Sequence, residues 1–214
     1  MLYESSIQKA NLIMELRSLG ITSNDVLSAI EKIPREIFLP STFKSYAYEN
    51  NPLPIGFEQT ISQPYIVALM TEALNLKGNE IILEIGTGSG YQTSVLSLLS
   101  RRVYSIERIK PLLVNALLCF KKLKLTNIVS KHDDGFLGWP KLAPFDHLII
   151  TCAIKKIDDR LLNQVRYNGI CIAPVATSLN QQRLKKIIVK DKRESDIWED
   201  LGEVSFVPLV SDYD

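Results

Sequence analysis

The chain has 214 residues, of which 46% are hydrophobic and 23% charged, as in an ordinary soluble globular protein. Lysine and arginine number 25 against 24 aspartates and glutamates, so a net charge of +1 offers no basic field for nucleic acid and no acidic composition typical of disorder. Apolar runs stay below the ~18 residues that span a bilayer, and no signal peptide is visible, so we expect a cytoplasmic protein without nucleic-acid or membrane partners.

The first 77 residues are predicted to form a helical N-terminal cap. Apolar residues recur at helical spacing up to Gly20, and a second apolar face runs from Val26 to Ile33, where Pro34 ends it. A third helix is expected over about residues 65–76. The proline-rich stretch between residues 34 and 64 is expected to form loops and short turns.

After Gly78, short apolar runs alternate with helical patterns near residues 91–100, 111–123 and 158–167. The apolar runs predict strands at residues 81–83, 103–106, 128–129, 148–150 and 170–173. Strands that are apolar on both faces and joined by helices indicate a parallel sheet covered on both sides.

The tail predicts two more strands, over residues 184–190 and 204–209, with a charged turn over 190–199. Because no helix separates them, we expect an antiparallel hairpin at the sheet edge. The predicted fold is therefore α/β, a Rossmann-like doubly wound, mostly parallel sheet of about seven strands with helices on both faces. Residues 1–214 are expected to form a single domain, with residues 78–214 as its α/β core.

The most informative segment is the glycine loop at residues 86–90, Gly-Thr-Gly-Ser-Gly, which follows an apolar strand. Glycines two residues apart let the backbone turn tightly and approach a ligand at the carboxyl edge of the sheet. Glu84 precedes the loop and would repel a pyrophosphate but suit a cationic ligand group. Glu107 ends the next strand, where a carboxylate can accept both hydroxyls of a ribose.

A ligand with a ribose, a positive charge and no phosphate fits S-adenosylmethionine better than NAD, whose folds use Gly-x-Gly-x-x-Gly. Asp134 and Gly135 follow the third strand, and the aspartate could accept from an adenine amino group, although Asp-Gly is also common as a plain turn. Two histidines and three widely spaced cysteines provide no ligand set for a metal, so none is expected.

Several motifs resemble those of the protein-L-isoaspartate O-methyltransferase family. The most specific are Thr-Ile-Ser-Gln-Pro at residues 60–64 and Gly-Trp-Pro at residues 138–140. The likeness extends over about residues 10–210 and includes segments 33–40, 83–92, 103–108, 143–146 and 206–209.

The resemblance implies an enzyme that methylates the α-carboxylate of L-isoaspartyl residues in damaged proteins and peptides, with S-adenosylmethionine as donor, in protein repair. Ser62 matches the family's active-site serine and would hold the substrate carboxylate; alternatively, it only caps the helix that begins near Pro64. The residues expected to bind the donor are Gln59, Thr60, Glu84, Gly86, Thr87, Gly88, Ser89, Gly90, Glu107, Arg108, Asp134, Gly135 and Thr151.

One departure from the family leaves alternatives open. Glu58 stands where the family usually has glycine, and it could restrict the loop or repel the incoming carboxylate. The same fold could therefore serve a different acceptor, or bind the donor without turnover. An NAD-dependent oxidoreductase is disfavoured by the glycine spacing, and a monomer is the default expectation.

Overall fold

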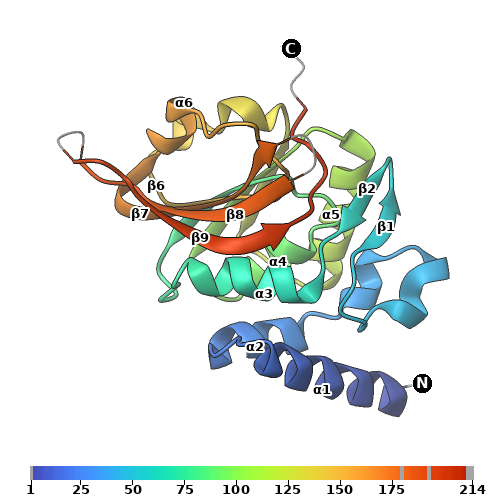
Figure 1. Cartoon of the computed structure of the whole chain (residues 1–214). Coiled ribbons are helices and arrows are strands. Elements are labelled where there is room, and N and C mark those ends of the chain that lie inside the picture. Colours follow the sequence, from blue (N-terminus) through green and yellow to red (C-terminus); the bar gives the residue numbers. More distant parts are fainter. Residues whose placement is uncertain (1, 179–180, 192–193, 211–214) are drawn as a thin grey trace.

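The structure is a computed structural model that describes residues 2–178, 181–191 and 194–210. Its strands and helices form a layered α/β arrangement with the two first helices stacked at one end (Figure 1). The strands are β1 (Leu53–Gly56), β2 (Gln59–Ile61), β3 (Ile81–Ile85), β4 (Arg102–Glu107), β5 (Ile128–His132), β6 (Phe145–Ile150), β7 (Val165–Ser178), β8 (Gln181–Ile188) and β9 (Ile197–Val204). The α-helices are α1 (Leu2–Ser18), α2 (Asn24–Lys32), α3 (Pro64–Ala73), α4 (Tyr91–Ser97), α5 (Lys110–Lys122) and α6 (Asp159–Leu162).

The main sheet has the order β5-β4-β3-β6-β7-β8-β9. The first five of these strands are mutually parallel, whereas β8 runs antiparallel to both β7 and β9. The chain leaves β3 toward β4 on one side and returns to β6 on the other, so the strand order reverses between β3 and β6. Open α/β sheets bind their ligands at the carboxyl end of such a reversal.

The central strand β3 is buried on both faces, which explains its continuous apolar sequence. Ile82 packs with Met70 of α3 and with Leu74 just after that helix, while Leu83 packs in the opposite cluster, which also contains Leu161 of α6. The predicted sheet with helices on both faces is therefore confirmed, although the second face is covered by one short helix and irregular segments.

The N-terminal helices are fixed to the sheet through α3. Ser23 caps α2 by accepting from the Val26 amide at 3.3 Å. Glu72 of α3 accepts from the Thr22 and Ser23 amides at 2.9 and 2.5 Å. Figure 1 shows α1 and α2 beneath α3, and their apolar residues share one core cluster with Tyr91 of α4.

The stretch expected to be loops contains more structure than predicted. Residues Arg35–Phe38 and Ser41–Tyr46 form short 3-10 helices, and β1 and β2 form a hairpin. Phe57 and Glu58 at its turn have φ values of 53° and 58°. Hairpin turns of this left-handed kind usually show Asn-Gly or Gly-Gly, so the signal was missing from the sequence.

Two predictions near the C-terminus are wrong. The helix expected over residues 158–167 ends at Leu162, and β7 begins at Val165. Of the strand expected over residues 204–209, only Val204 belongs to a strand, because β9 comes earlier and overlaps the predicted turn; the rest is an extended segment with an isolated bridge between Pro208 and Ala153. Residues 192–193 of that turn lie outside the described residues.

The sequence did not predict β9 at its position because β9 is an edge strand that is stabilised by ion pairs. Glu199 pairs with Lys186 at 3.0 Å, and Asp200 pairs with both Arg183 and Lys185 of β8 at 3.0 Å. Its first four residues are all exposed, so no apolar alternation marks it as a strand. The sequence correctly predicts an antiparallel pair of strands at the sheet edge, but it places the second strand too far toward the C-terminus.

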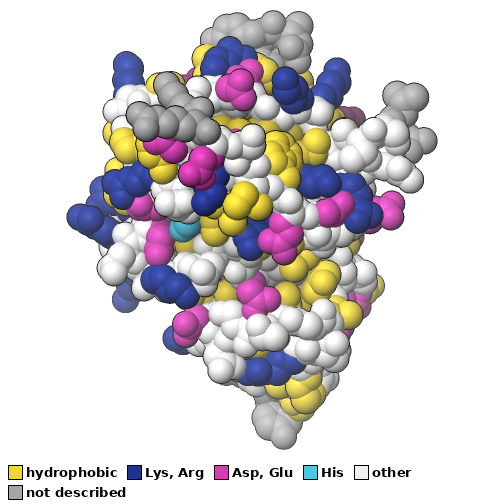
Figure 2. All heavy atoms as spheres, turned by 60° about the vertical axis from the view of Figure 1, so that its left-hand side comes forward, with side chains coloured by type: hydrophobic (Ala, Val, Ile, Leu, Met, Phe, Trp, Pro, Cys, Tyr) yellow, Lys and Arg dark blue, Asp and Glu magenta, His cyan; other side chains and the backbone are white. Residues whose placement is uncertain are grey.

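Charges of both signs are interspersed over the face shown in Figure 2. Among the helices of the described ranges, none has both the length and the apolar composition needed to cross a membrane.

Candidate functional site

Two adjoining cavities lie at the carboxyl edge of the sheet. The first has a volume of about 110 Å³ and lies against the glycine loop after β3, where the sequence predicts the methyl donor; we call it the donor cavity. The second, of about 320 Å³, lies between the end of β2 with the residues after it and the end of β9 with the residues after it; we call it the acceptor cavity, for the role proposed below. Four residues line both cavities: Thr60, Ser62, Thr151 and Val207.

The glycine loop has a conformation that side chains would prevent. Gly86 has φ +95°, and a Cβ there would lie 2.4 Å from the Thr151 Oγ1 atom. Gly88 has φ +53°, and its Cβ would meet nothing nearer than a methyl group of Ile55 at 3.9 Å. The backbone at Gly88 is therefore open to the donor cavity, as close approach of a ligand requires.

Glu107 is oriented at the rim by the backbone. It ends β4, and its carboxylate accepts from the Gly88 amide at 2.7 Å and from the Ile109 amide at 2.8 Å, one on each oxygen. A carboxylate has about four acceptor positions, so two remain for a pair of donors. This fits the two adjacent hydroxyls of a ribose.

Glu84 lies beneath the donor cavity rather than in its lining. It is fully buried, and one carboxylate oxygen accepts from the hydroxyls of Thr93 and Ser105, each at 2.5 Å. Ser105 in turn contacts the Thr87 hydroxyl at 2.5 Å. Burial raises the pKa of the Glu84 carboxyl to about 7. In this position Glu84 supports the loop from below, and it does not face a cationic ligand group as we expected.

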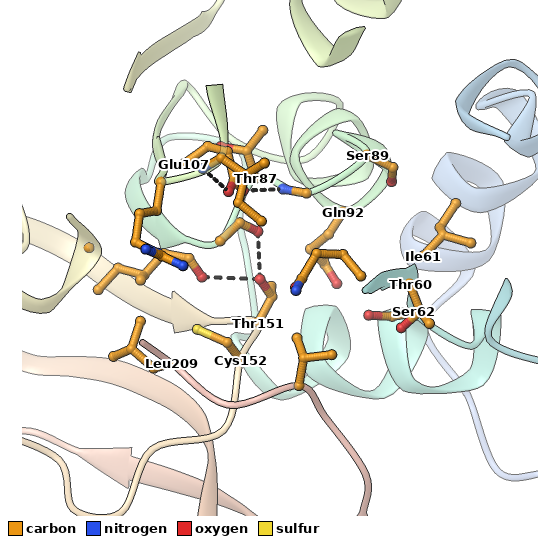
Figure 3. Close-up of a pocket in the computed structure, with 18 of the residues that line it drawn as sticks. Thr60, Ile61, Ser62, Thr87, Ser89, Gln92, Glu107, Thr151, Cys152 and Leu209 are labelled. Carbon is orange, nitrogen blue, oxygen red and sulfur yellow. Dashed lines mark hydrogen bonds between the residues drawn. The ribbon is translucent and has the colours of Figure 1, made fainter. Parts of the chain in front are cut away.

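The side of the site opposite Glu107 is formed by the segment after β2. In Figure 3, Thr60 and Ser62 extend toward the cavity from that side, and Thr151 lies between them and Glu107. Thr151 is held at the end of β6 by donating its hydroxyl to the Gly86 carbonyl at 2.5 Å. The N-cap of α3 is Gln63, and the Asn50 side chain, not that of Ser62, accepts from the Tyr65 amide of the first turn at 2.9 Å, so the capping alternative for Ser62 finds no support.

Most residues predicted for the site line these cavities: Gln59, Thr60, Ser62, Gly86, Thr87, Gly88, Ser89, Glu107, Arg108, Gly135 and Thr151. Besides Glu84, two do not. Gly90 lies outside the lining, and the Asp134 side chain accepts from the Phe136 amide at 2.8 Å, which is the plain-turn geometry.

Sequence reasoning missed several lining residues. Val207 and Leu209 close the donor cavity because Val207 accepts from the Ala153 amide at 2.8 Å and Leu209 donates to the Ala153 carbonyl at 2.7 Å. Cys152 also lines it, and burial raises the pKa of its thiol to about 12, so the thiol is unreactive. Val207 and Leu209 were expected in a strand, and only their position in the fold shows that they border a cavity. Within the described ranges, no group of three or more potential metal ligands comes together.

Comparison with known proteins gives consistent results. The profile of the family described as protein-L-isoaspartate(D-aspartate) O-methyltransferase matches residues 7–214. A protein-L-isoaspartate O-methyltransferase of Dictyoglomus turgidum is 48% identical over 207 residues, which cover 96% of this chain and 92% of that protein.

Solved structures agree with the fold. A protein-L-isoaspartate O-methyltransferase structure superposes with a TM-score of 0.86 and 27% identity, over 95% of this chain and 66% of that one. A second, from Plasmodium falciparum in complex with S-adenosyl-L-homocysteine, has a TM-score of 0.79 and 24% identity, over 94% of this chain and 97% of that one. The second likeness supports the fold alone.

Proposed function

The chain belongs to the protein-L-isoaspartate(D-aspartate) O-methyltransferase family, and from this premise we propose that it methylates the α-carboxylate of L-isoaspartyl residues in damaged proteins and peptides, with S-adenosylmethionine as donor. The observation that carries the proposal is the junction of the two cavities at Thr60, Ser62, Thr151 and Val207. A donor in one cavity and an acceptor in the other would meet there.

The donor cavity suits S-adenosylmethionine. Glu107 has acceptor positions left for the ribose, and the open backbone at Gly88 permits close approach. When bound, S-adenosylmethionine supplies a methyl group activated by its sulfonium charge. Charged side chains of the lining are Glu107 and Arg108, which offers no cluster of cations for a pyrophosphate.

The acceptor needs placement more than activation. A carboxylate with a pKa near ~4 is ionised at pH 7 and is itself the nucleophile, so no general base is required. The chain has to hold one oxygen roughly 3–3.5 Å from the methyl carbon and exclude water. We assign the first task to the Ser62 hydroxyl, which can donate to the other oxygen of the acceptor. The β1–β2 hairpin and residues 207–210 would close the site against water.

The proposal is tested with labelled S-adenosylmethionine and two peptides that differ only in an isoaspartyl or a normal aspartyl linkage. We expect base-labile methyl groups, released as methanol, from the isoaspartyl peptide alone. Methylation of both peptides would contradict the proposed specificity. Donor binding without methylation of either would indicate another acceptor or a protein without turnover.

Replacing Ser62 with alanine tests the role of its hydroxyl. A lost hydrogen bond to a charged group costs about 1.5–3 kcal/mol, so we expect kcat/KM for the isoaspartyl peptide to fall by roughly 10- to 100-fold. The dissociation constant of S-adenosylhomocysteine should stay unchanged, because Glu107 and the glycine loop, and not the Ser62 hydroxyl, are proposed to bind that ligand. Unchanged turnover in the variant would remove Ser62 from the mechanism.

We also propose that the protein acts in the cytoplasm as a monomeric, single-domain enzyme. All three cysteines are free thiols, which is typical of reducing compartments. Sedimentation at two protein concentrations would test the monomer.

A further inference from the structure

The acceptor is an anion, yet the lining of the two cavities carries little positive charge. The charged side chains that line them are Glu107, Glu203 and Arg108, which sum to −1. A substrate carboxylate entering this lining would meet net repulsion. Beyond the sulfonium of bound S-adenosylmethionine, a positive charge behind the lining would offset this repulsion.

Arg35 lies directly behind Ser62. It stands on the 3-10 helix Arg35–Phe38, and no part of it is exposed. Its guanidinium donates to the Ala47 carbonyl at 2.7 Å, the Asn51 carbonyl at 2.9 Å and the Ser62 carbonyl at 3.1 Å. One buried side chain therefore fixes the backbone of Ser62 to the N-terminal cap.

No acid in the part of the chain that the structure describes neutralises the charge of Arg35. Its three acceptors are neutral carbonyls, and the Nε atom has no hydrogen-bond partner among the described residues. The carboxylate of the adjacent Glu36 accepts from the Tyr48 hydroxyl instead, and the guanidinium lies 5.8 Å from the ring centre of Tyr91. Burial lowers the pKa of Arg35 to about 10, so it stays charged at neutral pH.

We propose that Arg35 is a positioning residue for the methyl acceptor: it orients Ser62 through the Ser62 carbonyl and supplies the buried positive charge that attracts the isoaspartyl carboxylate. The inference rests on the proposed function. A neutral residue could tie the same carbonyls together at a lower desolvation cost, because an unpaired buried ion costs several kcal/mol. A charge behind one peptide group acts through a medium of low polarity and is only weakly screened by salt.

The N-terminus of α3 adds to this field. Helix α3 has ten residues and begins at Pro64, two residues after Ser62, and its first turn contributes Ile66 to the acceptor cavity. The positive end of the helix dipole therefore faces the same side. Removing Arg35 should weaken the attraction without abolishing it.

The test compares two ligands that differ in charge alone. One is an isoaspartyl peptide and the other is the same peptide with its isoaspartyl α-carboxylate converted to a carboxamide. Dissociation constants are measured in the presence of S-adenosylhomocysteine, and the quantity of interest is the preference for the carboxylate over the amide. We expect Arg35→Gln to reduce this preference about tenfold and Arg35→Lys, which keeps the charge, to retain it.

Arg102→Gln is the matched control, because it removes the same charge from an exposed position at the start of β4, at the edge of the sheet opposite the two cavities. Its preference ratio should stay close to that of the parent protein. If Arg35→Gln and Arg35→Lys weaken both ligands equally, the role of Arg35 is structural and the proposal is overturned. An equal loss of preference in Arg102→Gln would show an effect of net charge alone and would also overturn it.

A salt titration of the unmodified protein covers the case in which Arg35→Gln does not fold. We expect the preference for the carboxylate to persist between 50 mM and 1 M salt, concentrations that span Debye lengths of roughly 14 to 3 Å. Its disappearance at 1 M would assign the attraction to exposed charges and overturn the proposal. Failure of the unmodified protein to methylate the isoaspartyl peptide is a different result, which contradicts the proposed function itself.

Discussion

Glu84 lies under the glycine loop, where its described partners are hydroxyl groups, and the pKa of its carboxyl is raised from 4.5 to about 7. Burial is the main cause, with the nearby charge of Glu107 acting in the same direction. Because the folded pKa exceeds the unfolded one, the contribution of this group to stability is full below about pH 4.5. It is lost as the pH rises through about 7.

Replacing Glu84 with glutamine removes this titration while keeping the shape. We expect the free energy of unfolding of Glu84→Gln, relative to the parent protein, to rise by about 3 kcal/mol between pH 4.5 and pH 8. Denaturant unfolding at several pH values measures it. Glu31→Gln, at an exposed position of α2, serves as the control and should show no such trend. A pH-independent difference for Glu84→Gln would contradict the argument.

The contrast between Glu84 and Glu107 shows what a residue pattern can predict. Glu107 ends its strand, so its place at the rim follows from strand length alone. Glu84 lies inside a strand that is buried on both faces. The sequence therefore predicts that its side chain is buried, but not whether that side chain borders a cavity. Its hydroxyl partners come from α4 and β4, which only the folded arrangement brings together.

At the scale of elements, the β1–β2 hairpin carries a conformational cost. Both turn residues, Phe57 and Glu58, have left-handed φ values, which cost residues other than glycine about 1 kcal/mol each. Glu58 lines neither cavity. The carboxylate that departs from the family pattern therefore affects the turn rather than the site.

We expect Glu58→Gly to raise the free energy of unfolding by up to about 1 kcal/mol, since relief of strain exceeds the added freedom of the unfolded chain. Glu58→Gln keeps the backbone cost and should leave stability unchanged. Isoaspartyl methylation should proceed in both variants as in the parent protein. A large gain in turnover upon either change would show instead that the carboxylate repels the substrate.

The elements that sequence patterns predicted well are those with apolar periodicity. Helices α2 and α5 bury an apolar face, and strands β3, β4 and β6 contain short continuous apolar runs, so their positions were evident. Strand β9 is stabilised by ion pairs with β8. In the sequence, its charged residues resemble those of a solvated turn, so the strand was not predicted there.

On the scale of the whole molecule, donor binding should couple to global stability. The donor cavity is lined by segments from both halves of the chain, including Ser62, Gly86 and Val207. S-adenosylhomocysteine at a hundredfold excess over its dissociation constant should add about 2.7 kcal/mol, which raises Tm by roughly 5–10 °C for a domain of this size. Thermal unfolding with NAD as the control measures this, and an equal shift with NAD would contradict the donor assignment.

The layers and the strand reversal between β3 and β6 could be predicted, because they follow from the alternation of apolar strands and helices. The junction of two cavities could not. It depends on bringing Ser62, Thr151 and Val207 to one place, and those residues lie far apart in the sequence.

The segment at residues 207–209 is hydrogen-bonded to both backbone groups of Ala153, and its position in the chain has a consequence for biosynthesis. Residues 207–209 follow β9 almost directly, so during translation this wall of the donor cavity is added after every strand of the sheet. A chain truncated before residue 207 would contain all of these strands and still lack one wall of the donor cavity. The ability to bind the methyl donor would therefore arise only after the strands of the sheet have been made.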